Sequence, residues 1–157
     1  MRSTESGAFT RRYALRKRWK LNQQLADAIA AEIRSPFIDA GAGLGEYVRY
    51  WLCLGKHGYG LDGIDSVHQL SDRWVEYADL SYPVDVERFT PANTVISIEV
   101  GEHIPEHRAG FFLDNLCVLT LDRLIVSWAV PGQRGTGHVN CRPPEWVEQQ
   151  VRARGFR

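Results

Sequence analysis

The chain has 157 residues, a length that suits one domain with its own hydrophobic core. Its hydrophobic fraction of 44% excludes a disordered chain, and its formal net charge of +0 provides no global field favouring nucleic acid or a membrane surface. No apolar run approaches the ~18 residues of a membrane span, and the N-terminus has no apolar signal core, so we expect a cytoplasmic protein.

Residues 1–34 are expected to form an N-terminal arm and a helix. The first residues are small and polar, which predicts a frayed end, and apolar side chains at helical spacing predict one helix over 12–34. The basic run at 11–20 suits either a solvated helix face or a recognition arm for an anionic substrate, and we favour the solvated face. A lid formed by Tyr13 and Trp19 is a further alternative to simple packing.

A glycine-rich turn follows a short apolar strand that ends at Asp39, with glycines at the alternate positions Gly41, Gly43 and Gly45. Glycine permits φ > 0 and lets a ligand approach bare backbone, and a strand that turns into a helix aims free N–H groups outward. The segment therefore predicts a nucleotide-type site. Glu46 stands where a pyrophosphate-binding turn has its third glycine, and its charge disfavours a nicotinamide dinucleotide.

The rest of the chain alternates between helical and strand patterns. In chain order we expect a helix at 46–57, a strand at 59–62, a short helix after 65, strands at 75–78 and 94–99, a helix at 106–120, a strand at 123–129, a glycine-rich loop at 131–140 and a last helix from 143. This alternation predicts an α/β fold with a doubly wound parallel sheet and helices on both faces.

Carboxylates gather at the expected carboxyl ends of these strands, which is the edge where open α/β sheets bind ligands. They are Asp39, Asp62, Asp79 and Glu99, with Asp65 as a rival to Asp62. An acidic rim suits a cationic ligand better than a ligand rich in phosphate.

These segments together resemble the class I S-adenosylmethionine-dependent methyltransferases, over roughly residues 37–156. The glycine turn is similar to motif I of that family, and the ends of strands two to five follow in the family's order. The matching segments are Asp39-Ala40-Gly41-Ala42-Gly43-Leu44-Gly45, Gly60-Leu61-Asp62-Gly63, Glu76-Tyr77-Ala78-Asp79-Leu80, Val95-Ile96-Ser97-Ile98-Glu99-Val100-Gly101-Glu102-His103-Ile104-Pro105 and Leu124-Ile125-Val126-Ser127-Trp128. The resemblance implies a Rossmann-like sheet in the strand order 3-2-1-4-5.

The resemblance also implies S-adenosylmethionine as the cofactor and assigns residues to its parts. Asp62 would hold the ribose hydroxyls, Asp79 would reach the adenine amino group, and the glycines would let the methionine part approach the backbone. The full expected cofactor-binding set is Asp39, Gly41, Gly43, Gly45, Asp62, Asp79 and Glu99.

A second set of polar residues follows the fourth strand and recurs in the glycine-rich loop: Glu99, Glu102, His103 and His138. Both segments should lie at the carboxyl edge of adjacent strands, so the groups could converge. The set resembles the metal-binding pattern of small-RNA 3′-terminal 2′-O-methyltransferases and, less closely, that of ubiquinone-pathway O-methyltransferases. A divalent metal is therefore an alternative. We favour a metal-free site in which Glu102, His103 and His138 are the catalytic residues, with a histidine as base.

The resemblance implies an enzyme that transfers a methyl group to an oxygen or nitrogen of a small molecule or, alternatively, of a nucleic-acid terminus such as RNA. A non-catalytic S-adenosylmethionine-binding or assembly module is the rival. The sixth and seventh strands of the family fold have no counterpart in the sequence, so we expect either a truncated chain or an exposed apolar edge at strand five. Such an edge invites pairing with another chain, which makes a homo-oligomer an expectation.

Overall fold

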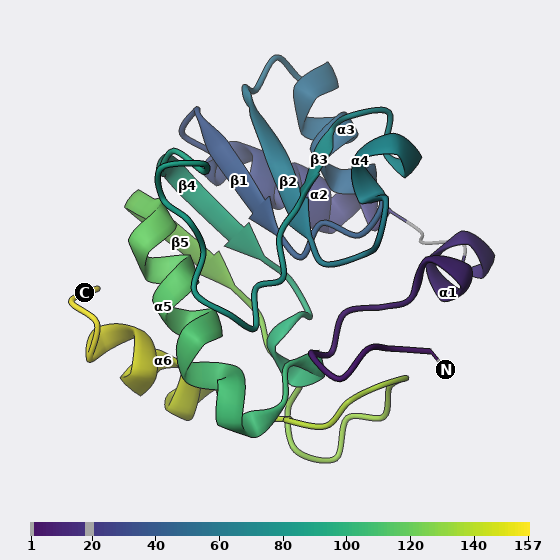
Figure 1. Cartoon of the computed structure of the whole chain (residues 1–157). Helices are drawn as coiled ribbons and strands as arrows, with labels where there is room; N and C mark the ends of the chain where they lie inside the picture. Colours follow the sequence, from purple (N-terminus) through teal and green to yellow (C-terminus); the bar gives the residue numbers. More distant parts are fainter. Residues whose placement is uncertain (1, 18–20) are drawn as a thin grey trace.

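Five parallel strands form the centre of the molecule, in the order β3-β2-β1-β4-β5 (Figure 1). The strands are β1 (Phe37–Ala40), β2 (Gly58–Asp62), β3 (Val75–Tyr77), β4 (Ala92–Ser97) and β5 (Thr120–Val126). This computed structural model describes residues 2–17 and 21–157. The parallel order confirms the predicted Rossmann-like, doubly wound fold class, with fewer strands than the family fold.

Helices cover both faces of the sheet (Figure 1). The helices are α1 (Arg11–Arg16), α2 (Gln23–Glu32), α3 (Glu46–Cys53), α4 (Val67–Leu70), α5 (Ala109–Leu119) and α6 (Pro144–Arg152), with 3-10 turns η1 (Gly101–His103) and η2 (Glu106–Arg108). Successive side chains of a strand point to opposite faces. Phe37 accordingly packs in the cluster with α2 and α3, while Ile38 packs in the cluster with α5 and α6.

The N-terminal region differs from the sequence prediction. The expected single helix over 12–34 is two helices, because Leu21 and Asn22 are not helical and the Asn22 side chain accepts a hydrogen bond from Leu25 N (3.2 Å), which caps α2. The preceding residues are not frayed, since Ser3 and Phe9 form an antiparallel bridge. The proposed lid residue Trp19 lies outside the described residues.

Strand β5 is one edge of the sheet, as the sequence predicts. Its residue Leu121 is 65% exposed, and a groove of about 700 Å³ runs between β5 and α6. Within the described ranges, every helix is too short or too polar to cross a membrane.

Candidate functional site

A cavity of about 410 Å³ opens at the carboxyl ends of the strands. Its lining includes most of the predicted cofactor-binding residues: Asp39, Gly41, Gly43, Asp62, Asp79 and Glu99. Gly45 is not part of the lining; it precedes α3 with φ = 85°. The rival carboxylate Asp65 is exposed and is also absent from the lining.

The glycine turn fits closely against its neighbours, except at one position. Gly41 has φ = 91°, and a Cβ there would lie 2.3 Å from Val100 Cγ2. Gly43 has φ = 59°, and a Cβ there would meet no atom within 4 Å. The turn therefore leaves open space at Gly43, on the wall of the cavity.

The N–H groups of this turn are already used within the protein. Those of Gly41 and Ala42 donate to Leu61 O at 2.7 and 3.0 Å, and that of Gly43 donates to Asp62 Oδ2 at 2.8 Å. The expectation of free N–H groups aimed outward is therefore wrong for these residues. These three N–H groups are therefore not available to bind a phosphate.

Three carboxyl groups crowd the same wall. Burial raises the pKa of Asp39 to about 7, with further contributions from the charges of Asp62 and Glu46. Burial also raises the pKa of Asp62 to about 6, although its carboxylate accepts hydrogen bonds from the backbone, including Ile64 N at 2.9 Å. Burial raises the pKa of Glu46 as well. A cation in the cavity would stabilise the ionised forms of all three groups.

Asp79 is held in one orientation by its neighbour Ser81. Its Oδ1 accepts hydrogen bonds from Ser81 N (3.0 Å) and Ser81 Oγ (2.8 Å). The Arg108 guanidinium donates to Ser81 Oγ at 3.2 Å and lies over the Tyr82 ring. These contacts fix one oxygen of Asp79, a residue of the cavity lining, and no hydrogen bond from the described residues engages its second oxygen.

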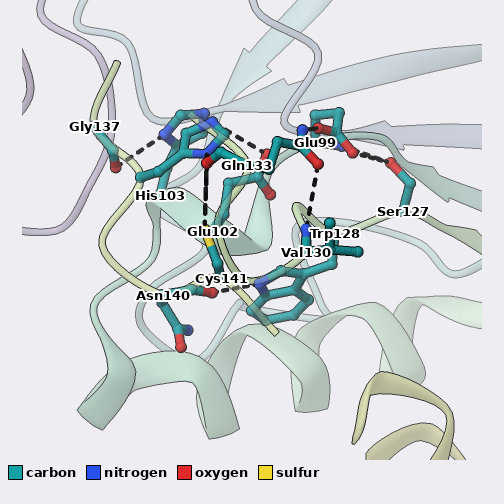
Figure 2. A network of polar contacts seen from close by, with 11 residues as sticks. Glu99, Glu102, His103, Ser127, Trp128, Val130, Gln133, Gly137, Asn140 and Cys141 are labelled. Carbon is teal, nitrogen blue, oxygen red and sulfur yellow. Dashed lines mark hydrogen bonds and ion pairs between the residues drawn. The ribbon is translucent and has the colours of Figure 1, made fainter. Parts of the chain in front are cut away.

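Glu102, His103 and His138 come together beside the cavity, with donor atoms all within 4.8 Å of one another. Figure 2 shows the surrounding contacts. Glu102 is fully buried, and neither of its carboxylate oxygens has a hydrogen-bond partner among the described residues. The nearest basic atom is His138 Nε2, 3.8 Å from Glu102 Oε1. Burial is the main cause that raises the pKa of Glu102, and the neighbouring backbone and His138 offset it only in part.

Both histidines use Nδ1 for backbone contacts. His103 Nδ1 lies 3.1 Å from Gly137 O, and His138 Nδ1 lies 3.2 Å from Gln133 O. A carbonyl can only accept, so Nδ1 carries a proton in each ring, and in the neutral tautomer Nε2 keeps its lone pair. Burial lowers the pKa of His103, which favours its neutral form. The cluster thus offers the Nε2 atoms of two imidazoles and one carboxylate.

Glu99 is not a member of this cluster, so only part of the predicted set converges. Its backbone turns with φ = 57°, and its exposed carboxylate accepts hydrogen bonds from Ser127 Oγ (2.9 Å) and Gln133 Nε2 (2.7 Å) (Figure 2). Glu99 therefore ties the end of β4 to the end of β5 and to the loop that follows it.

Sequence reasoning missed several walls of the cavity. The segment Ser6–Phe9 lines it, and a Cβ on Gly7 would lie 2.1 Å from His103 O. Tyr47 and Trp51 on α3 line it as well. The apolar spacing of α3 explains only its packing on the sheet, and no local pattern identifies the arm as a wall.

No protein-family model matches the sequence, and no curated protein matches it either. Solved structures do. Magnesium protoporphyrin IX methyltransferase from Synechocystis PCC 6803 superposes with a TM-score of 0.69 at 19% identity, over 91% of this chain and 83% of that chain. The methyltransferase domain of the bacterial protein CtHen1 superposes with a TM-score of 0.67 at 21% identity, over 87% of this chain and 86% of that chain.

A third similar structure is the glycopeptide N-methyltransferase MtfA, with a TM-score of 0.67 at 14% identity over 90% of this chain and 82% of that chain. Identities this low support an inference about fold and not about substrate. The sheet order, the glycine turn after β1 and these superpositions agree with one another. The chain therefore has the fold of the class I S-adenosylmethionine-dependent methyltransferases, as its sequence resemblance predicts.

Proposed function

We propose that the protein is an enzyme that transfers a methyl group from S-adenosylmethionine to an oxygen or nitrogen nucleophile. The observation that carries this proposal is the acidic cavity at the glycine turn, lined by Asp39, Glu46 and Asp62. S-adenosylmethionine bears a sulfonium and an ammonium group, and both would favour the ionised carboxylates. The similar structures support it, because they are structures of methyltransferases, one of them with bound SAH.

The cavity divides naturally among the parts of the cofactor. Open space at Gly43 accommodates the methionine part, Asp62 binds the ribose, and the free oxygen of Asp79 accepts a hydrogen bond from the adenine amino group. In the transfer itself, the bond between methyl carbon and sulfur breaks and its electron pair stays on sulfur. The nucleophile forms the new bond to carbon, and a proton that it carries passes to Nε2 of His103 or His138.

A divalent cation at the Glu102, His103 and His138 cluster is the second candidate. The observation favouring it is the buried Glu102 carboxylate, which has no hydrogen-bond partner among the described residues. Two imidazole nitrogens and a carboxylate suit Mn²⁺, Fe²⁺ or Zn²⁺. When bound, the ion would polarise an acceptor hydroxyl and lower its pKa. The metal-free site that the sequence favours uses the same three residues, so the two candidates exclude one another and are separated by the titration described below.

Ligand binding tests the main proposal. SAH or S-adenosylmethionine at about 100 times its dissociation constant should stabilise the protein by about 2.7 kcal/mol, whereas NAD should not. Asp62→Asn should weaken SAH binding, and the matched variant Asp65→Asn, which removes an exposed carboxylate, should not. No stabilisation by either adenosyl ligand would refute the proposal. Tight binding with no transfer of labelled methyl to any acceptor would favour the non-catalytic module instead.

Calorimetric titration with Mn²⁺ tests the cation site. We expect binding by the wild-type protein and loss of binding in Glu102→Gln and His138→Ala. Glu145→Gln is the control, because Glu145 is an exposed carboxylate at the start of α6. Equal titration curves for all four proteins would rule the site out.

The acceptor is proposed to be a small molecule or, alternatively, an RNA terminus. The similar structures are methyltransferases of a porphyrin, a glycopeptide and small RNA, so the structural similarity does not select one class of acceptor for this protein. We also propose that the protein acts in the cytoplasm as a single domain.

A further inference from the structure

Unpaired arginines gather on the N-terminal helix α1. Five arginines elsewhere in the described chain reach carboxylates, as in the contacts of Arg34 with Asp122 (2.8 Å) and Arg154 with Asp114 (2.7 Å). Among the described residues, the exposed side chains on α1 make no such contact: Arg11, Arg12 and Arg16. Arg12 and Arg16 are four positions apart, a spacing at which like charges destabilise a helix. No carboxylate of the described residues forms an ion pair with the arginines of α1.

A chain of aromatic contacts connects α1 to the candidate catalytic histidine. The Phe9 ring lies 4.9 Å from the His103 ring and 4.9 Å from the Tyr13 ring. Lys17 lies over the Tyr13 ring, with its ammonium 6.0 Å from the ring centre. The Phe9 ring therefore bridges the basic helix α1 and the transfer site.

A second basic segment reaches the same histidine from the loop after β5. Gly137 O contacts His103 Nδ1, and Arg134 lies exposed three residues earlier, with no ion pair to any described residue. Figure 1 shows the N-terminal segment and this loop at the same end of the molecule, at the carboxyl ends of the strands. The cofactor cavity is acidic, whereas the segments that border its outer side near His103 are basic.

We propose that the methyl acceptor carries a phosphate group, which binds to the arginines of α1 and to Arg134 while the nucleophile points toward His103. This inference rests on the proposed function and names the substrate class of the same site. Guanidinium groups match phosphate oxygens in geometry and charge. The carboxylates of the cavity repel phosphate, so the acceptor can enter in only one orientation. The arginines of α1 and Arg134 also carry more positive charge than a single carboxylate of the acceptor would neutralise, which favours the more highly charged phosphate.

Paired ligands test the proposal on the full chain saturated with SAH. Calorimetry compares the affinity for uridine 5′-monophosphate with that for uridine, and the affinity for glucose 6-phosphate with that for glucose. A short single-stranded RNA is titrated as a third phosphate-bearing ligand, without a neutral counterpart. We expect at least one phosphate-bearing ligand to bind about tenfold more tightly than its neutral counterpart, or the RNA to bind measurably, with an affinity that falls as salt rises. The ligand that binds identifies which kind of molecule carries the phosphate. Absence of measurable binding by every phosphate-bearing ligand overturns the proposal.

Charge-removing variants assign the effect to α1. Arg12→Gln combined with Arg16→Gln should abolish the preference for phosphate and leave SAH affinity unchanged. The control, Arg152→Gln combined with Arg157→Gln, removes the same charge at α6 and the C-terminal end and should keep the preference. If the wild-type protein fails to bind SAH, the proposed function fails. If SAH binds normally but the α1 variant keeps the preference, only the phosphate inference fails.

Discussion

The buried carboxyl group of Asp39 lowers the stability of the ligand-free protein when it is ionised. It is 6% exposed, and burial together with two neighbouring carboxylates raises its pKa from 3.8 to about 7. Each unit of difference between the folded and unfolded pKa corresponds to roughly 1.4 kcal/mol. Asp39 therefore destabilises the free protein at neutral pH by a few kcal/mol, a strain that a cationic ligand relieves.

This strain predicts a pH dependence of stability with a defined sign. Between about pH 4 and pH 7 the unfolded chain ionises Asp39 while the folded protein keeps it protonated, so the free energy of unfolding falls as pH rises. Asp39→Asn should flatten that fall. Chemical denaturation at a series of pH values measures it, with Asp65→Asn as the control that keeps the wild-type profile. A wild-type stability that rises across this interval would contradict the assignment.

Ser81 should act on adenine recognition through Asp79. Ser81→Ala removes the hydroxyl that donates to Asp79 Oδ1 and accepts from Arg108, so the carboxylate can rotate away. We expect SAH to bind about tenfold more weakly, from the loss of about 1.4 kcal/mol. S-inosylhomocysteine, which lacks the amino group, should bind the variant and the wild type more equally. An equal loss for both ligands would indicate general disorder of the loop instead.

Among the elements, the N-terminal arm is the one that covers the site from outside the sheet, through its lining residues Ser6–Phe9. It closes over the cavity because Gly7, with φ = 94°, lets the backbone touch His103 O. Gly7→Ala should displace the arm and weaken SAH binding several-fold. Gly55→Ala is the matched control, since Gly55 has φ = 79° and a Cβ there meets no atom within 4 Å. Both variants strain the backbone similarly, so equal SAH affinities measured by calorimetry would show that the arm is dispensable.

The break between helices α1 and α2 was not predicted from the sequence. The residues between them include no proline or glycine, so local preference predicts a continuous helix. Tertiary packing overrides it, because Ala14 packs with Ile64 and Val67, whereas Ile29 packs with Trp51. Asn22, a favourable N-cap residue, was the one local signal that could have revealed the break.

At the scale of the whole molecule, the strand sequence and the glycine spacing were sufficient to predict the sheet, because apolar runs and turns are local signals. They also predicted that Glu102, His103 and His138 converge, since adjacent strands end at one edge. The departure of Glu99 was not predictable. It depends on a positive φ that the sequence pattern does not encode for a glutamate.

The edge strand β5 predicts self-association. Leu121 is 65% exposed on it, and an edge strand presents unpaired backbone groups on its outer side. Sedimentation velocity should therefore reveal a dimer whose population grows with concentration. Leu121→Lys should dissociate it, while Val139→Lys, at an equally exposed position on the loop after β5, should not. A monomer at every concentration would contradict this expectation.

The position of Trp51 gives the protein a built-in optical probe. The indole is fully buried, donates a hydrogen bond to Ala26 O (3.0 Å), and borders the cavity. A buried indole emits at shorter wavelength than an exposed one such as Trp74, which is 42% exposed. An adenosyl ligand entering the cavity would change the quenching of Trp51, which lines the cavity, whereas Trp128, which is also buried, does not line it. Occupancy can thus be followed in the unlabelled protein, in real time and at concentrations too low for calorimetry.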